Sequence, residues 1–171
     1  MKHIFGGIIL GGKNKKDKEI NKELEKKYMK FALIEAKKAY ELEEVPIGAV
    51  IVYNEKIIAR GHNLKEKNND PTAHAEIIAL KKASEYLSGW RLNECDLYVT
   101  IEPCPMCAGA MIQARINKLI YGAEDKKMGA VDSLYNLLND KRFNHQIAVT
   151  KGIMVKESRD IMQKFFKKLR K

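Results

Sequence analysis

A chain of 171 residues, of which 45% are apolar and 32% charged, is long enough for one domain with a hydrophobic core, and this composition excludes a disordered protein. It has no apolar run of the roughly 18 to 20 residues that a membrane-spanning helix needs. Its three cysteines are too few for a disulfide framework, so we expect a cytoplasmic protein without a membrane partner.

The net charge of +10 is concentrated at the two ends of the chain. Residues 1–30 and residues 156–171 each carry +5, whereas the middle of the chain holds equal numbers of basic and acidic residues. Basic ends attract polyanions, nucleic acid first among them. Solvated lysine-rich helix faces would explain the same charge equally well.

Residues 1–21 form an N-terminal extension that mixes glycine with lysine and shows no lasting periodicity, so we expect it to be disordered. Its apolar run, Ile4 to Leu10, is interrupted by Gly6 and Gly7 and has no small-x-small cleavage site. These features argue against a secretory signal.

From Asn21, apolar residues recur at spacings of three and four, which predicts a helix that ends before Pro46 and Gly48. The sequence GAVIVYNEKIIARGHN, residues 48–63, then predicts a β-hairpin with the turn at Asn54-Glu55. Asp70-Pro71-Thr72 marks the start of a second helix, with the aspartate or the threonine as its cap.

Strands and helices alternate through the rest of the chain. The predicted elements are a strand at 95–101, a helix at 107–116, a strand at 117–123, a short apolar helix or turn at 133–140, a strand at 146–153 and a basic amphipathic helix at 155–171. This order predicts one α/β domain, residues 22–171, with a mixed sheet between two helical layers.

Two short motifs suggest a metal site. His74, Cys104 and Cys107 offer one imidazole and two thiols, which are the ligands that zinc prefers. Three ligands favour an open, catalytic site in which water takes the fourth position. Glu76 lies two residues after the histidine and is free to move protons beside such a water. Both ligand groups fall at predicted helix starts, where the helix dipole favours thiolate.

Other interpretations of these motifs remain. An isolated H-x-E is common, and a lone C-x-x-C also occurs as a redox pair. His62 and His145 are possible fourth ligands of a closed site, although neither has the spacing of a paired ligand. Pro103 directly before the first cysteine, together with His74 upstream, favours the catalytic metal site.

The pairing of H-A-E with P-C-P-M-C is the signature of zinc-dependent nucleobase deaminases. From about residue 22 to the end, the chain resembles bacterial tRNA-specific adenosine deaminases, a family of the cytidine/deoxycytidylate deaminase superfamily. The resemblance is carried by EVPIGAV, GHN, DPTAHAEI, LYVTIEPCPMCAGAMI, YGAEDKKMGAVDSL, FNH and FFKKLR.

This resemblance implies a three-layer cytidine-deaminase fold whose five-stranded sheet has helices on both faces. It implies a homodimer with one Zn²⁺ per subunit that converts adenosine to inosine at the wobble position of tRNA-Arg(ACG), bound through its anticodon stem-loop. The carried-over ligands are His74, Cys104 and Cys107, and Glu76 is the proton shuttle that serves the attack of activated water on C6 and the release of ammonia.

The resemblance also implies three residues that contact the substrate. Asn63 would contact the target nucleoside, Pro46 would belong to the wall around the base, and Asp125 would contact the nucleic-acid backbone nearby. Met128 departs from the family, which carries a small or polar residue at that position.

The basic final helix offers further contacts to RNA. Its cations would line the path of the stem, and Phe165 and Phe166 would stack on a base, although a phenylalanine pair on an amphipathic helix more often packs in the core. A deaminase of free bases such as guanine or cytosine would share the zinc motif, and a zinc-stabilised RNA-binding module without catalysis is a third possibility.

Overall fold

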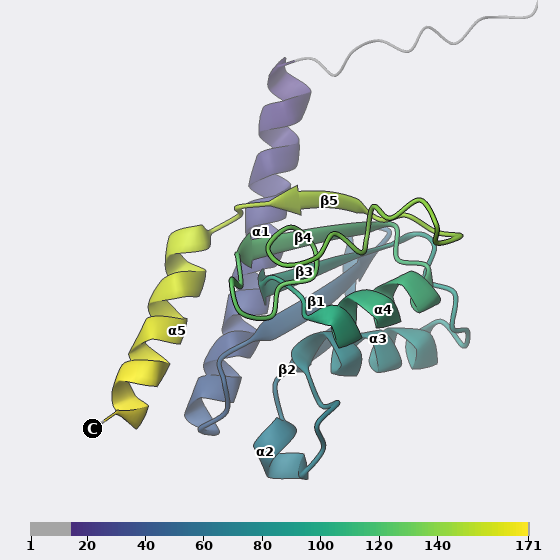
Figure 1. Ribbon diagram of the computed structural model, residues 1–171. Helices are drawn as coiled ribbons and strands as arrows, with labels where there is room; N and C mark the ends of the chain where they lie inside the picture. The colour runs from purple at the N-terminus through teal and green to yellow at the C-terminus, as the bar shows by residue number, and fades with distance from the viewer. Residues whose placement is uncertain (1–14, 171) are drawn as a thin grey trace, which may run out of the picture.

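The structure, a computed structural model, describes residues 15–170 and contains a five-stranded mixed sheet between two layers of helices, as expected from the sequence (Figure 1). The elements in chain order are α1 (Lys15–Glu41), β1 (Gly48–Tyr53), β2 (Lys56–His62), α2 (Lys65–Asn68), α3 (Ala75–Tyr86), β3 (Cys95–Ile101), α4 (Pro105–Ala114), β4 (Lys118–Ala123), β5 (Ala148–Lys151) and α5 (Val155–Leu169). No helix within residues 15–170 combines the length and the apolar character needed to cross a membrane.

The strands lie in the order β2-β1-β3-β4-β5. β1 is antiparallel to β2 and β3, while β3, β4 and β5 run parallel to one another. The hairpin predicted at residues 48–63 is confirmed, with Tyr53 opposite Lys56 across the turn. Because β3 and β4 are parallel, the segments that follow them both emerge at the same edge of the sheet.

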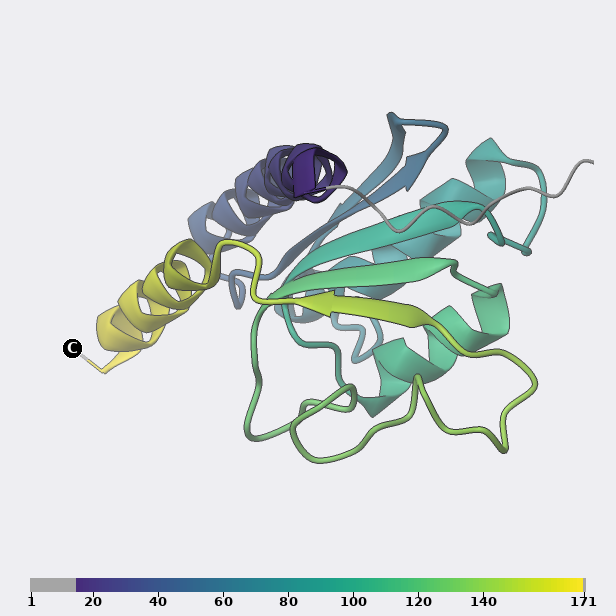
Figure 2. The ribbon, with the colours of Figure 1, turned by 90° about the horizontal axis from the view of Figure 1, so that it is seen from above.

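The two faces of the sheet carry separate cores. Figure 2 shows α1 and α5 side by side on one face and α3 and α4 on the other. The alternation of side chains along β1 serves both faces, because Ala49 and Ile51 belong to the core under α3 and α4, and Val50 and Val52 to the core under α1. Because β1 is buried on both faces, it packs against both helical layers and fixes their positions relative to the sheet.

The first helix begins at Lys15, six residues before the predicted start at Asn21. The residues added before Asn21 are mostly charged. The apolar pattern alone could not reveal this, because the added turns project beyond the sheet (Figure 1). The predicted disorder of residues 1–21 is therefore wrong for residues 15–21, and residues 1–14 lie outside the described part of the chain.

The predicted cap at Asp70 or Thr72 is also wrong. Asp70 Oδ1 accepts hydrogen bonds from the backbone N–H and the hydroxyl of Thr72, which makes a local turn and not a helix cap. The chain then continues in an extended conformation to His74, which is the residue that precedes the first turn of α3. The four-residue α2 was not predicted, and residues 133–140 form turns and not a helix.

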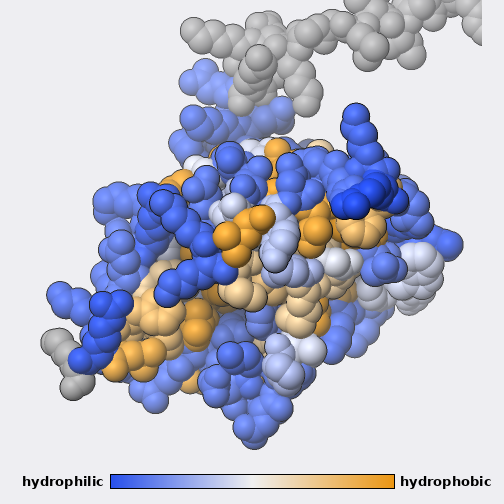
Figure 3. Space-filling model, viewed as in Figure 1, coloured by the Kyte–Doolittle hydropathy of each residue, from blue (hydrophilic) through white to orange (hydrophobic). Residues whose placement is uncertain are grey.

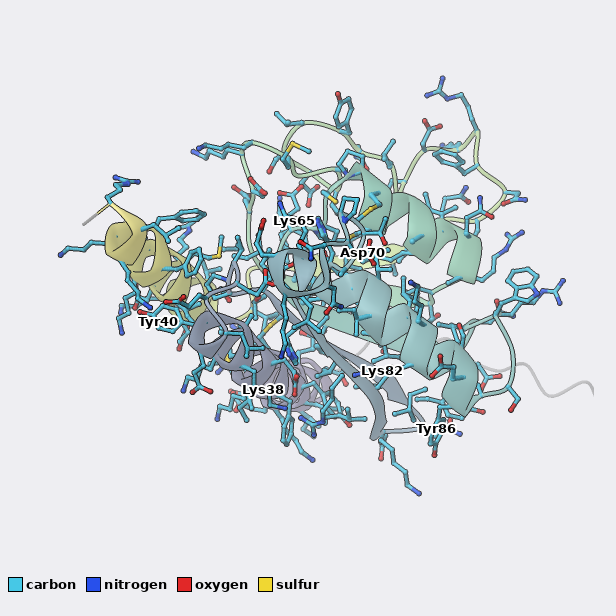
Figure 4. All side chains as sticks on the ribbon, turned by 90° about the horizontal axis from the view of Figure 1, so that it is seen from below. Lys38, Tyr40, Lys65, Asp70, Lys82 and Tyr86 are labelled. Atoms are coloured by element: carbon cyan, nitrogen blue, oxygen red, sulfur yellow. The ribbon has the colours of Figure 1, made fainter. Side chains whose placement is uncertain are left out.

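The final helix packs against the end of α1, near labelled Tyr40 in Figure 4. Phe165 is buried and meets the Tyr40 ring edge-on at 6.1 Å between centroids. Lys168 bonds Glu43 at 3.0 Å just beyond α1. The expectation that at least one of the two phenylalanines packs in the core is therefore confirmed, while Phe166 stays 40% exposed.

Candidate active site

The three expected metal ligands come together at the starts of two neighbouring helices. His74 is the N-cap residue of α3, Cys104 is the N-cap residue of α4, and Cys107 lies in the first turn of α4. Pro105 occupies the first position of α4, where no backbone N–H is needed. Because α3 and α4 cover the same face of the sheet, their N-termini point the three side chains at one place.

The spacing of these atoms fits a zinc ion. His74 Nδ1 lies 3.7 Å from the sulfur of Cys104 and 3.5 Å from that of Cys107, and all three ligand atoms lie within 4.8 Å of one another. With Zn–N and Zn–S bonds of about 2.1 and 2.3 Å, a tetrahedral site places nitrogen and sulfur about 3.6 Å apart. The chain therefore supplies three corners of a tetrahedron.

The environment of Cys104 favours the thiolate form, whereas the hydrogen bond to Cys104 and burial raise the pKa of Cys107. A hydrogen bond from Cys107 and the neighbouring His74 ring lower the pKa of Cys104 to about 4. Its place at the N-terminus of α4 acts in the same direction, because the helix dipole stabilises negative charge there. The cluster therefore holds a thiolate, the form of cysteine that binds metal.

Glu76 lies in the first turn of α3, only 3% exposed, with its carboxyl group against the cluster. Burial raises the pKa of Glu76 to about 7, although its contacts with the His74 ring and the Cys107 thiol act in the opposite direction. Its Oε2 has no hydrogen-bond partner within the described residues. A buried carboxylate oxygen without a partner is costly in a merely structural position, and this one faces a group of metal ligands.

Asn63 and Pro46 lie beside this cluster. The backbone N–H of Asn63 donates to Ile47 at 3.1 Å, which ties it to the residue after Pro46. The next N–H, of Leu64, donates at 3.0 Å to Ala73, the neighbour of His74. Asn63 and Pro46 are both buried. The structure therefore places both residues on segments close to His74.

The backbone of Asp125 is held by a buried carboxylate that the sequence did not reveal. Glu102, at the end of β3 and two residues before Cys104, is 3% exposed. Its Oε2 accepts from the Asp125 backbone at 3.0 Å and from the Ser133 hydroxyl, and its Oε1 accepts from the backbone of residues 131–133 at 2.8 to 3.1 Å. Burial raises the pKa of Glu102, but these hydrogen bonds outweigh burial and leave it lowered.

Glu44 is a second buried carboxylate that was missed, and it bonds the side chain of Asn63. Neither glutamate belongs to a motif with a recognisable spacing. The one available signal for Glu102 was its position between a buried strand and Pro103, where a charged residue is unexpected.

The placement of Glu76 depends on Gly61, and this dependence gives a testable prediction. A Cβ on Gly61 would collide with the backbone oxygen of Ala75, in the first turn of α3. Gly61→Ala should therefore displace that turn, destabilise the fold by about 2 kcal/mol and lower turnover about 100-fold.

Thermal unfolding and initial rates would test this effect of Gly61→Ala. Gly109→Ala, in α4, is the matched control, because a Cβ there meets no atom within 4 Å. The control should keep its activity and gain about 0.5 kcal/mol or more from helix propensity. Equal behaviour of the two variants would contradict the dependence.

The sheet order and the His-Cys-Cys-Glu site together define a deaminase, and a family model described as MafB19-like deaminase matches residues 21–170. The tRNA-specific adenosine deaminase of Bacillus subtilis is 51% identical over 144 residues, covering 84% of this chain and 89% of that protein. The protein of the same name from Haemophilus influenzae is 43% identical over 153 residues, covering 89% and 88%. The chain belongs to the family of tRNA-specific adenosine deaminases.

Two solved structures are also similar to this chain. One described under A-to-I editing by tRNA:A34 deaminases at the wobble position is 47% identical, with a TM-score of 0.76 over 78% of this chain and 97% of that one. This match confirms the cytidine-deaminase fold. A guanine deaminase from Bacillus subtilis is 43% identical with a TM-score of 0.55, covering 57% of this chain and 63% of its own.

Proposed function

We propose that this protein deaminates adenosine to inosine at the wobble position of tRNA-Arg(ACG), bound through its anticodon stem-loop. The observation that carries the proposal is the buried Oε2 of Glu76, which has no hydrogen-bond partner within the described residues and lies beside three atoms that could hold a metal. The named function of the relatives supports tRNA as the substrate, and the wobble position comes from the described activity of one similar structure.

His74, Cys104 and Cys107 would hold one zinc ion per subunit. When bound, zinc supplies a water whose pKa is lowered from about 16 toward neutrality. Glu76 takes one proton from the attacking water and passes it to N1 of the adenine. It then takes the second proton from the new hydroxyl at C6 and delivers it to the amine, which leaves as ammonia. A single carboxylate can do this only if it is not itself a ligand, and the free Oε2 meets that condition.

A groove lined in part by Ile101, at the end of β3 that leads to Cys104, offers a path for the anticodon loop. It has a volume of about 760 Å³ and lies between α5, the loop that holds Asp125, and the residues on either side of Pro46. Its lining includes the half-exposed Phe166, and its charged residues are three cations and two acids: Lys126, Lys127, Arg159, Glu124 and Asp125. Figure 3 shows hydrophobic side chains gathered over and beside α5 among hydrophilic ones. Cations for phosphate and an aromatic face for a base suit a single-stranded nucleic acid.

Met128 gives this groove an apolar edge. It is 55% exposed beside Asp125 and lines the groove. We place Asp125 at the nucleic-acid backbone and Pro46 in the wall around the base, because the groove joins these two segments.

The cations near the start of α1 lie away from this groove. Lys22 lies in a hollow beside the start of β3 and β4, where Glu25 bonds Lys118 at 2.6 Å. The metal ligands follow the other end of β3, about 20 Å away along a seven-residue strand. Of the α5 cations, Arg159 therefore belongs to the proposed RNA path, and Lys22 at the start of α1 does not.

This difference predicts a contrast between two sets of lysines and arginines. Replacing Lys126, Lys127 and Arg159 with alanine should weaken stem-loop binding at least about 10-fold. It should also reduce the slope of log Kd against log salt by about 2, because each lost contact to single-stranded nucleic acid removes about 0.7.

The matched control for this contrast is the alanine variant of Lys22, Lys26 and Lys27, which removes the same charge at the start of α1. Its affinity and salt slope should stay near those of the original protein. Fluorescence anisotropy at several salt concentrations measures both. An equal loss from the two triple variants would mean that net charge, and not the groove, attracts the RNA.

We propose further that two copies associate as a homodimer in the cytoplasm. An apolar hollow of about 630 Å³ between α3 and α4, with half-exposed Trp90 at its edge, supports the association. Light scattering of the purified protein would give the mass that tests it.

The deciding experiment measures inosine in a synthetic stem-loop with an ACG anticodon, with free adenosine, cytidine and guanine beside it. Inosine at the wobble position alone would support the proposal. Ammonia from guanine alone would favour the second candidate, a guanine deaminase, which the similarity to the Bacillus subtilis structure suggests. A zinc-loaded protein that binds the stem-loop and deaminates none of these would be a binding module.

A further inference from the structure

Glu44 lies in the turn between α1 and Pro46 and is only 1% exposed. Burying a carboxylate so completely is unfavourable unless hydrogen bonds satisfy its oxygens. Its Oε1 accepts from the backbone N–H of Lys67, in α2, at 2.7 Å, and its Oε2 accepts from the side-chain Nδ2 of Asn63 at 3.2 Å. The two oxygens therefore have different partners, one structural and one at the proposed substrate contact.

The bond to Glu44 determines which way the Asn63 amide points. The two ends of an asparagine amide are alike in size, but the oxygen only accepts hydrogen bonds and the nitrogen only donates them. A carboxylate oxygen can face only the nitrogen, because two acceptors would repel each other. Glu44 thus excludes the flipped amide, in which the Asn63 oxygen would take the place of the nitrogen.

We propose that Glu44 is a positioning residue that fixes the direction in which the Asn63 amide meets the target nucleoside. The inference rests on the proposed contact between Asn63 and that nucleoside. The ring edge of a purine presents hydrogen-bond donors and acceptors in a fixed order. A flipped amide would therefore place donor against donor or acceptor against acceptor. A polar group that is buried with the wrong partner loses far more binding than a missing methylene does. Glu44 therefore contributes to base selection without touching the base.

Glu44→Gln separates this role from a structural one. The glutamine has the same shape, and its oxygen can still accept from the Lys67 N–H and hold α2. The amide nitrogen of the glutamine would then face Asn63. The Asn63 amide would turn over so that its oxygen accepts a hydrogen bond from that nitrogen. The variant should keep the fold and reverse the Asn63 amide.

The experiment is a double-mutant cycle on the zinc-loaded protein with the stem-loop substrate. Glu44→Gln and Asn63→Ala should each lower kcat/KM about 100-fold, with the melting temperature of Glu44→Gln within a few degrees of the original. The double variant should have nearly the same kcat/KM as Asn63→Ala alone, because Glu44 acts through the Asn63 side chain, which is already removed. Asn63→Ser, which keeps a small donor for Glu44, takes the same place in the cycle if the alanine variant folds poorly.

Glu35→Gln is the matched control. Glu35 is equally buried at 2% exposure, but it bonds Lys38 and His62 and not Asn63. Its variant should keep kcat/KM within about threefold, because it leaves the Asn63 amide as it was.

Four results would overturn the inference in distinguishable ways. A normal kcat/KM in Glu44→Gln, or the same loss with and without the Asn63 side chain, would show that Glu44 does not act through Asn63. Normal activity in Asn63→Ala would remove the proposed substrate contact and this inference with it. A zinc-loaded original protein that leaves the stem-loop unmodified would refute the proposed function itself.

Discussion

Glu76→Ala should lower kcat by about 10⁴-fold and leave metal binding intact. A single general acid or base contributes at most about that factor, and Glu76 is proposed to serve several proton transfers in turn. Its side chain is not among the three ligand atoms that converge at the site, so zinc content should stay at one per chain. Single-turnover rates and metal analysis on the same preparation would measure both quantities.

The same substitution should not weaken the fold. Glu76 is deeply buried, and its Oε2 lacks a partner, so the native state bears the cost of this carboxylate. The melting temperature of Glu76→Ala should equal or exceed that of the original protein. Near-normal turnover would refute the shuttle role, and loss of zinc would mean that the carboxylate helps to hold the metal.

Glu102→Ala should have the largest effect on stability, about 4 kcal/mol. The substitution leaves the backbone N–H groups of Asp125 and residues 131–133, and the Ser133 hydroxyl, without their acceptor. For a chain of this length the loss corresponds to a melting temperature roughly 10 °C lower. Thermal and denaturant unfolding would test it, and Glu94→Ala, at an exposed glutamate near the start of β3, should change neither.

Glu102→Gln should affect the loop more than the fold. Its one remaining oxygen can satisfy residues 131–133, while its amide nitrogen would oppose the N–H of Asp125. We expect about 1 to 2 kcal/mol of destabilisation together with a raised KM for the stem-loop. A KM unchanged in Glu102→Gln would show that the position of Asp125 does not matter for binding.

The sequence revealed the residues whose chemistry depends on spacing. His74, Glu76, Cys104 and Cys107 stand out because their residue types are unusual in such close pairs, and the structure brings the three proposed ligands together. The five strands were also predictable, since buried strands in a mixed sheet are apolar runs bounded by turn residues.

The supporting carboxylates could not be predicted in the same way. Glu44 and Glu102 bond partners 19 to 31 residues away, and these contacts exist only once the chain has folded. A lone glutamate in a sequence is normally a solvated residue. The early start of α1 was missed for a related reason, because residues 15–20 are mostly charged and give no apolar pattern.

The division of the molecule into two helical layers has an evolutionary consequence. The proposed metal ligands and Glu76 belong to α3 and α4, whereas the groove cation Arg159 and Phe166 belong to α5, on the other face of the sheet. Substitutions in the final helix can therefore accumulate without disturbing the groups that perform the reaction.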